Sequence, residues 1–225
     1  FAIADTHLSF ASNKPMDDFE GWLNYTDRLK ENWNKIIDDK DYVVIAGDIS
    51  WAMNFDELKA DFDYINRLNG KKIILKGNHD YWWNTMSKMN KFIEENNFNT
   101  ISILHNNAFD FDDFSVCGSR GWFFDSDEEQ NEKVLNREVM RIKTSIESAL
   151  NCEKIVFLHY PPVYENQCCE EIVNLLKEKG IKKCYYGHIH GVAAKYAFDD
   201  NYDGIDFKLI SADRLNFMPL LIKKF

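Results

Sequence analysis

Five of the six histidines in this sequence fall into an ordered set of short polar groups that also contain aspartate and asparagine. The groups are Asp5-Thr6-His7, Gly47-Asp48, Gly77-Asn78-His79-Asp80, His159-Tyr160-Pro161-Pro162 and Gly187-His188-Ile189-His190. Imidazole and oxygen ligands without thiolates suit Mn²⁺, Fe, Zn²⁺ or Co²⁺ rather than a structural cysteine-rich zinc site. The groups therefore predict a metal centre, whereas His105, the sixth histidine, belongs to no group and is interpreted as structural.

Each group directly follows a short apolar run that we interpret as a β-strand. The runs are residues 1–4, 42–46, 72–75, 154–158 and 183–186. In an open α/β sheet the carboxyl ends of the strands line one crevice, so the five groups can converge there. Gly47, Gly77 and Gly187 suit sharp exits at which the backbone approaches a ligand closely.

Taken singly, most of these groups have an ordinary structural interpretation. A lone D-x-H is close to noise in a chain this rich in aspartate, and a lone G-D is a turn. The Gly187-His188-Ile189-His190 group is more specific, because period-two spacing on extended backbone places both imidazoles on one side. The combination, in order and at successive strand ends, favours a functional site over chance.

The intervening segments have helical periodicity, so the chain is expected to adopt an α/β fold. The expected helices are residues 19–37, 55–68, 84–95, 127–150 and 168–179. Further short strands are expected at 101–104, 108–111 and 115–117, followed by a β-meander of 192–198, 207–211 and 220–222. We find neither a linker nor an internal repeat, which predicts a single domain over residues 1–225. The 127–150 helix is either a lid over the crevice or a surface helix.

Composition and charge restrict the partners. The 27 basic and 37 acidic side chains give a net charge of −10, which disfavours long nucleic acid and anionic membranes but allows a small phosphorylated substrate. Apolar runs stay well short of the ~18 residues that span a bilayer. The five cysteines form no C-x-x-C pair and are expected to be reduced, in a cytoplasmic protein. The oligomeric state stays open.

The ordered pattern D-x-H, G-D, G-N-H-D, H and G-H-x-H resembles that of the calcineurin-like metallophosphoesterase superfamily, and the resemblance spans residues 5–190. It implies a four-layer αββα sandwich of two mixed β-sheets flanked by helices. It also implies two divalent ions, with Mn²⁺ expected first and Fe, Zn²⁺ or Co²⁺ as alternatives. The ligands implied for one ion are Asp5, His7, Asp48 and His190. Those implied for the other are Asp48, Asn78, His159 and His188, with Asp48 bridging.

By the same resemblance, the chain hydrolyses a small phosphodiester or phosphomonoester by attack of a metal-bound hydroxide. His79 would be the general acid and transition-state stabiliser, and Asp80 would orient it. Two alternatives stay open, namely a catalytically inactive scaffold with this fold and a nuclease-type diesterase. His79 favours an enzyme, because a scaffold has no reason to keep a non-ligand histidine among intact ligands.

The loop after Asp48 narrows the choice within the superfamily. It reads Ile49-Ser50-Trp51-Ala52 and lacks the V-D-R-G segment of the protein Ser/Thr phosphatases, which puts that activity in doubt. The closer resemblance is to bacterial predicted phosphohydrolases and the class III phosphodiesterase-like branch. Arg120 and Trp51 are candidate substrate-binding residues, with a structural arginine and a core tryptophan as the alternatives. Arg214 has the same ambiguity.

Overall fold

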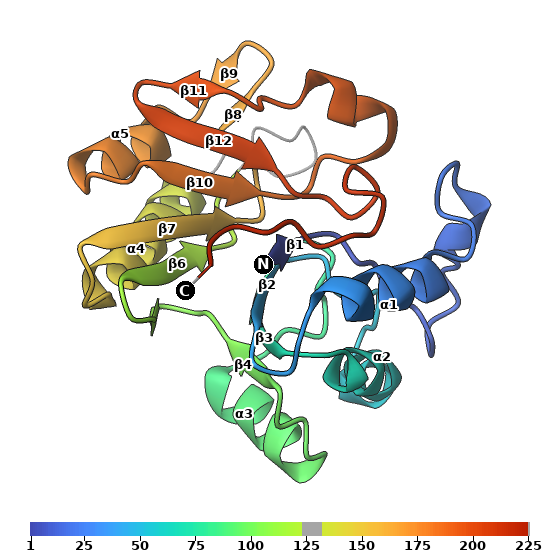
Figure 1. Cartoon of the computed structure of the whole chain (residues 1–225). Coiled ribbons are helices and arrows are strands. Elements are labelled where there is room, and N and C mark those ends of the chain that lie inside the picture. The colour runs from blue at the N-terminus through green and yellow to red at the C-terminus, as the bar shows by residue number, and fades with distance from the viewer. Residues whose placement is uncertain (123–131, 225) are drawn as a thin grey trace.

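The computed structural model of the chain describes residues 1–122 and 132–224, and two β-sheets dominate it (Figure 1). The first sheet is parallel and has the order β1 (Ala2–Ile3), β2 (Tyr42–Ala46), β3 (Lys71–Leu75) and β4 (Ile101–Ile103). Beside β1, Ala2 forms an antiparallel bridge with Leu220 and Ala4 a parallel bridge with Ser211. The C-terminal segment thereby covers the β1 edge of this sheet.

The second sheet is mixed. Its order is β11 (Asn201–Tyr202), β12 (Ile205–Leu209), β10 (Lys183–Tyr186), β7 (Glu153–Leu158), β6 (Phe114–Ser119) and β5 (Phe109–Asp110). The four central strands are parallel, and both edge strands are antiparallel to their neighbours. A separate hairpin joins β8 (Val163–Tyr164) and β9 (Gln167–Cys168), which the periodicity did not predict.

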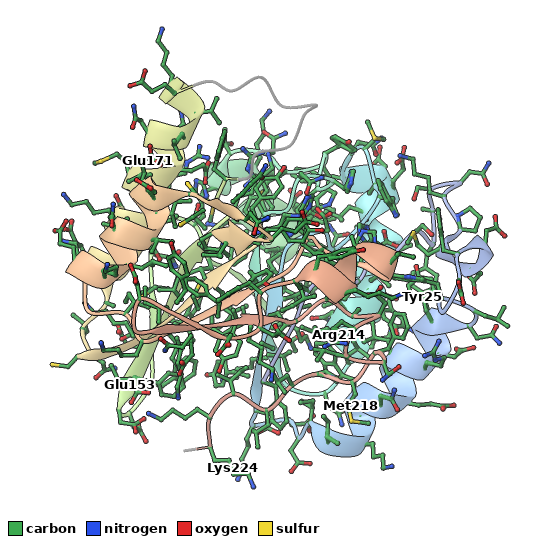
Figure 2. The ribbon with its side chains drawn as sticks, turned by 90° about the horizontal axis from the view of Figure 1, so that it is seen from above. Tyr25, Glu153, Glu171, Arg214, Met218 and Lys224 are labelled. Atoms are coloured by element: carbon green, nitrogen blue, oxygen red, sulfur yellow. The ribbon has the colours of Figure 1, made fainter. Side chains whose placement is uncertain are left out.

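Helices cover the outer face of each sheet. Helices α1 (Tyr25–Ile36), α2 (Phe55–Arg67) and α3 (Met86–Glu95) lie on the first sheet, and α4 (Glu132–Ser148) and α5 (Glu170–Glu178) lie on the second. Seen from above, Tyr25 of α1 and Glu171 of α5 stand on opposite sides of the molecule (Figure 2). In the described ranges, no helix combines the length and the apolar character needed to cross a lipid bilayer.

Strand periodicity explains why the sheets face each other. Val43 and Ile45 of β2 point to the helices, whereas Val44 and Ala46 point to the second sheet. In β7, Ile155 and Phe157 meet the first sheet, while Val156 and Leu158 pack under α4 and α5. Because successive side chains of a strand point to opposite faces, apolar strands of this kind bury side chains on both faces of each sheet. Three buried apolar layers therefore lie between the four layers formed by the helices and the two sheets. The expected α/β sandwich is confirmed, while a single domain stays a prediction.

The expected helix over residues 19–37 is wrong in its first third. A 3₁₀ helix η1 (Met16–Asp18) precedes a turn, and α1 begins only at Tyr25. Gly21 and Asn24 have positive φ angles of 86° and 53°, and the Asn24 N–H donates to Asp17. This left-handed backbone interrupts the helix, and it leaves Phe19 and Leu23 exposed.

The expected C-terminal meander is also wrong. Residues 191–196 form a 3₁₀ helix η2 (Gly191–Tyr196), and β12 pairs in parallel with β10. The hairpin lies farther along the chain, where Asp203 and Gly204 take positive φ angles of 53° and 83° between β11 and β12. An Asp-Gly pair is the usual signal for such a turn and was available in the sequence. The first residues of the expected 127–150 helix lie outside the described residues.

Candidate metal centre

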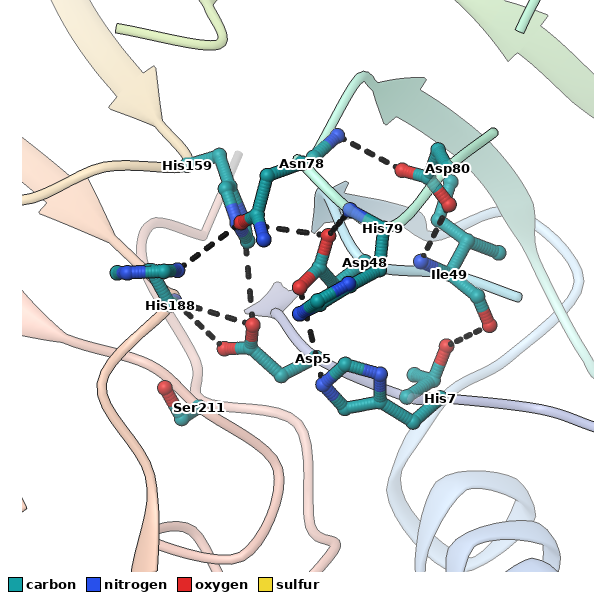
Figure 3. Close-up of polar contacts among 12 residues, drawn as sticks. Asp5, His7, Asp48, Ile49, Asn78, His79, Asp80, His159, His188 and Ser211 are labelled. Carbon is teal, nitrogen blue, oxygen red and sulfur yellow. Dashed lines mark hydrogen bonds and ion pairs between the residues drawn. The ribbon is translucent and has the colours of Figure 1, made fainter. Parts of the chain in front are cut away.

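The five polar groups converge where β1, β2, β3, β7 and β10 end, so both sheets contribute to one site. Figure 3 shows its imidazole and carboxylate side chains turned toward one another. Ligand atoms of Asp5, His7 and Asp48 all lie within 4.8 Å of one another, as do those of Asp48, His159 and His188. The Asp48 carboxylate belongs to both clusters.

The remaining two predicted ligands lie at the same centre. Asn78 Oδ1 is 2.6 Å from Nε2 of His159 and 3.0 Å from Nδ1 of His188. The His190 ring centroid is 5.3 Å from that of His7. The structure therefore brings together all seven residues that the sequence nominated, while their division between two metal ions stays a prediction.

The backbone at these strand ends is strained. Asp5, His7, Asp48 and His188 have φ angles of 57°, 42°, 48° and 71°. Positive φ is uncommon for residues other than glycine and costs of order 1–3 kcal/mol per residue. Such strain persists where surrounding contacts over-determine the geometry, and it is concentrated at functional sites.

Close packing of the loops explains why glycine occupies positions 47 and 77. A Cβ on Gly77 would overlap the Asp48 carboxylate, and one on Gly47, which has a φ of +87°, would lie 2.6 Å from Nδ1 of His159. Backbone hydrogen bonds join the same loops, since Asp5 N–H donates to the Gly47 carbonyl and His7 N–H to the Asp48 carbonyl, each at 3.0 Å. Larger residues at 47 or 77 would push the ligands apart.

The electrostatics of the protein alone are unfavourable to its carboxylates. Burial raises the pKa of Asp5 to about 8. Burial, then the neighbouring Asp80 and Asp5 carboxylates, raise the pKa of Asp48 well above its ordinary value. Burial, followed by the other imidazoles, lowers the pKa of His7 well below its ordinary value. The carboxyl groups resist ionisation and the imidazoles resist protonation because both are buried. A divalent cation would stabilise the ionised carboxylates and bind the neutral imidazoles.

His7 supplies a direct test of that fit. Its side chain is 1% exposed, yet neither ring nitrogen has a hydrogen-bond partner among the described residues. Its Nε2 lies 3.8 Å from Asp48 Oδ2, too far for a hydrogen bond. Because a buried polar nitrogen without a partner is costly, a ligand role for His7 is the natural explanation. The donor set fits divalent metal ions.

Asp80 is buried and fastens two loops together. Its carboxylate accepts hydrogen bonds from the N–H groups of Gly77 at 2.7 Å, Ile49 at 2.9 Å and Ser50 at 3.3 Å. Burial raises the pKa of Asp80 to about 6 against the opposing effect of these bonds. These contacts give Asp80 a scaffolding role, and its expected orientation of the His79 ring stays a prediction.

His79 lies beside the centre and is half-buried. Its N–H donates to Asp48 Oδ1 at 2.8 Å, and its Nδ1 lies 3.3 Å from the Tyr81 hydroxyl. The His79 ring is 4.3 Å from the ring of Trp51, and both line a cleft that also reaches His190. This position, next to the ligands and facing a cleft, is the one that a substrate-contacting residue requires.

The two weaker candidates differ in their surroundings. Trp51 stacks on the His7 ring at 4.9 Å, and its Nε1 donates to Met16 Sδ at 3.4 Å. The Arg120 carbonyl accepts the N–H groups of His159 and Tyr160, and its guanidinium lies 5.5 Å from the Tyr160 ring centroid. Trp51 therefore packs on His7, a predicted ligand, and lines the cleft, whereas the Arg120 backbone is hydrogen-bonded to the loop that carries His159.

Outside the centre lie His105 and Arg214. His105 is half-buried, 6.3 Å from the Trp83 ring centroid, and burial lowers its pKa. Arg214 is exposed and lies 4.0 Å from Asp199, on the segment that follows β12 (Figure 2).

Two residues beside the ligands went unnoticed in the sequence. Trp22 meets the rings of His7 and His190 edge-on at 5.9 and 6.2 Å. Asp213 accepts the N–H of Gly191 at 2.6 Å, and its charge opposes the lowering of the His190 pKa by burial. Neither Trp22 nor Asp213 belongs to a polar group that directly follows a strand. Both come close to the site only through the tertiary structure.

Comparisons with known proteins agree with the geometry. The family described as calcineurin-like phosphoesterase matches residues 1–192. Over 85 residues the chain is 34% identical to an uncharacterized protein of Methanocaldococcus jannaschii, a match that covers 36% of this chain and 46% of that protein. The matched part thus spans less than half the length of that curated relative.

Solved structures share the fold at low identity. A protein of unknown function from Aquifex aeolicus has a TM-score of 0.50 at 15% identity, over 97% of this chain and 92% of that chain. A phosphopantetheinyl hydrolase from Mycobacterium tuberculosis has a TM-score of 0.54 at 14% identity, over 93% and 87% of the two chains. At these identities the likeness concerns the fold.

Metal content is the first test of the centre. We predict that protein purified with Mn²⁺ holds two ions per chain, that Asp48→Asn lowers the occupancy of both, and that His190→Ala lowers one. The reason is that Asp48 belongs to both clusters, whereas His190 lies beside His7. Elemental analysis and anomalous scattering measure this, with His105→Ala as the control. A single ion that survives Asp48→Asn would contradict it.

A second prediction concerns the metal-free protein, whose free energy of unfolding should fall between about pH 6.5 and 8. The pKa of Asp5 is about 8 in the folded state and near 3.8 in the unfolded state, so only the folded state keeps its proton in this window. Asp48, whose pKa burial also raises, acts with Asp5. The Phe1 amino group, whose pKa burial lowers from 8.0 to about 6, opposes them within this window, and His7 opposes them below its ordinary pKa of 6.5. Urea unfolding in the presence of a chelator measures the free energy of unfolding at each pH. Asp5→Asn should make its decrease with pH smaller. A free energy that rises across this window would refute the prediction.

Proposed function

Because the chain belongs to the calcineurin-like phosphoesterase family, we propose that it hydrolyses a small phosphoester at a centre of two divalent metal ions. The observation that carries the proposal is the shared Asp48 carboxylate, which lies within 4.8 Å of the ligand atoms of both clusters. Metal-dependent phosphoester hydrolysis is the activity of the family, and a solved structure with this fold is named a phosphopantetheinyl hydrolase, which supports the proposal.

The two ions have distinct ligand sets in this proposal. Those of the first are Asp5, His7, Asp48 and His190, and those of the second are Asp48, Asn78, His159 and His188. Divalent ions bound there supply Lewis acidity, which lowers the pKa of a water molecule and withdraws charge from phosphoryl oxygens. Oxygen and imidazole donors without thiolate suit Mn²⁺, Fe, Zn²⁺ or Co²⁺, and Mn²⁺ is the metal proposed first.

His79 transfers the proton in this proposal. Its backbone N–H is fixed to Asp48, so the ring stays beside the centre. Nδ1 lies beside the Tyr81 hydroxyl, and Nε2 is the nitrogen that would protonate the leaving oxygen and stabilise the charge that develops on it. Trp51 restricts the ring from another side.

An inactive scaffold accounts less well for the same features. A scaffold needs neither the half-buried His79 lining the cleft beside the centre nor strained backbone at four predicted ligand positions. Strain of this kind stabilises nothing by itself and is retained where geometry matters for chemistry.

The charge of the cleft favours a substrate with few negative charges. Its charged lining residues are Arg28, Lys195, Glu20 and Asp213, whose formal charges cancel. Together with a net charge of −10, this disfavours long nucleic acid, whose binding needs several phosphate-neutralising cations. A small ester with a single negative charge at phosphorus is the better fit.

Substitution of His79 tests the mechanism. His79→Asn should keep the metal content and lower kcat by ~10²–10⁴, because general-acid and electrostatic contributions are each of that size. Turnover of p-nitrophenyl phosphate and bis-p-nitrophenyl phosphate is measured beside elemental analysis. His105→Asn is the matched control. Loss of a metal ion from His79→Asn would instead make His79 a ligand.

A preference for diesters over monoesters is the further prediction. A diester carries one negative charge at phosphorus, and the loop after Asp48 contributes no arginine for a dianion. The measurement compares kcat/KM for a monoester and a diester that share one leaving group, in the wild type and in Arg120→Ala. A monoester preference that disappears in Arg120→Ala would overturn the prediction and identify Arg120 as the reason.

A further inference from the structure

The cleft that reaches His79 and His190 is much larger than a phosphate group needs. Its volume is about 820 Å³, in the range of pockets that enclose whole small molecules. His79 and His190 of the predicted metal centre line part of it, and most of the remaining wall comes from the segment around η1, the start of α1 and η2. The space must therefore be explained by something other than the phosphoryl group.

Apolar side chains dominate the uncharged part of this wall. They are Met16, Phe19, Trp22, Trp51 and Val192. Trp22 and Trp51 form its inner part, where they contact the ring of His7. The charged lining residues cancel, so the cleft as a whole does not select a second anionic group. An apolar surface thus extends from the metal ligands toward solvent.

Two exposed apolar residues stand at the outer end of this surface. Phe19 is 59% exposed and Val192 is 71% exposed, and they come from segments far apart in the sequence. Val192 lies two residues after His190, and the Gly191 N–H bond to Asp213 fixes the backbone between them. Phe19 closes the η1 turn, with its N–H bonded to the Met16 carbonyl. Exposed apolar groups gathered at one cleft mark a binding surface.

We infer that this cleft binds the organic group of the phosphoester, that this group is uncharged, apolar and larger than a single aromatic ring, and that Phe19 and Val192 set this preference. The inference rests on the proposed function, since continuity with the metal centre is what assigns the cleft to substrate. A group of this size would reach from the leaving oxygen beside His79, past Trp22 and Trp51, to the two exposed side chains.

Two esters with leaving groups of similar acidity, a phenyl and a 2-naphthyl ester of the same phosphoryl group, isolate size from reactivity. The wild type should show a kcat/KM about five- to tenfold higher for the naphthyl ester, because the second ring buries additional apolar surface. Phe19→Ser with Val192→Ser should lower both values and bring their ratio close to one. Leu150→Ser, an 84% exposed leucine outside the cleft, is the matched control and should keep the wild-type ratio.

Binding gives a readout that does not depend on turnover. Phenylphosphonate and 2-naphthylphosphonate have a P–C bond in place of the ester, and calorimetry on Mn²⁺-loaded protein compares their Kd values. The inference is supported if 2-naphthylphosphonate binds more tightly than phenylphosphonate and the double substitution abolishes this difference. Absence of hydrolysis of both esters would then refute the proposed function alone. Equal Kd and equal kcat/KM for the two sizes in an active wild type would overturn the inference and leave the proposed function standing.

Discussion

The carboxylate of Asp48 is held at the junction of the two sheets by contacts from three sides, and the rest of the site depends on that placement. Its Oδ1 accepts the His79 N–H and lies 3.5 Å from Nε2 of His159. Only a glycine fits at position 77 beside it. These contacts require β2 and β3 to be neighbours and β7 to face them from the other sheet. The αββα packing is thus a condition for the centre as well as a way to bury apolar surface.

Holding the ligands this way is energetically unfavourable for the protein alone. Asp5, Asp48 and Asp80 are all buried, and burial raises the pKa of each. The positive φ angles at the strand ends add strain. Compensation comes from the three apolar layers and from backbone bonds between the loops, such as those of His7 and Leu8 to the carbonyls of Asp48 and Ile49. Because bound metal ions would stabilise what the protein alone does not, folding stability and metal binding would be coupled.

Sequence patterns anticipated the centre better than its surroundings. Ligand-type residues directly after apolar runs sufficed to place Asp5 and Asp48 together, because the ends of neighbouring parallel strands meet at one edge of a sheet. His159 follows β7 of the second sheet, so its position beside them depends on the packing of the two sheets. Residues 19–24 and 192–198, which were misassigned, border the cleft. Phe19, Leu23 and Val192 strengthened a helical or strand pattern, yet the fold leaves them exposed. Periodicity treats every apolar residue as part of the core, so it errs where apolar residues serve binding instead. Contacts such as those of Asp80 and Trp22 arise from tertiary structure and leave no trace in spacing.

Trp51 shows how cleft and centre are linked. The sequence left a choice between stacking on substrate and packing in the core, and in the structure Trp51 packs against the core and also lines the cleft. Its ring stacks on His7 and lies 4.3 Å from that of His79, while Nζ of Lys14 is 4.4 Å from its centroid. With its ring already engaged, Trp51 offers substrate an edge rather than a free stacking surface. A group bound in the cleft would press against a side chain that itself positions a ligand and the proposed proton donor. Recognition of the organic group and alignment of the reacting groups would then depend on the same packing. This is a physical reason for a tryptophan in the loop that follows Asp48.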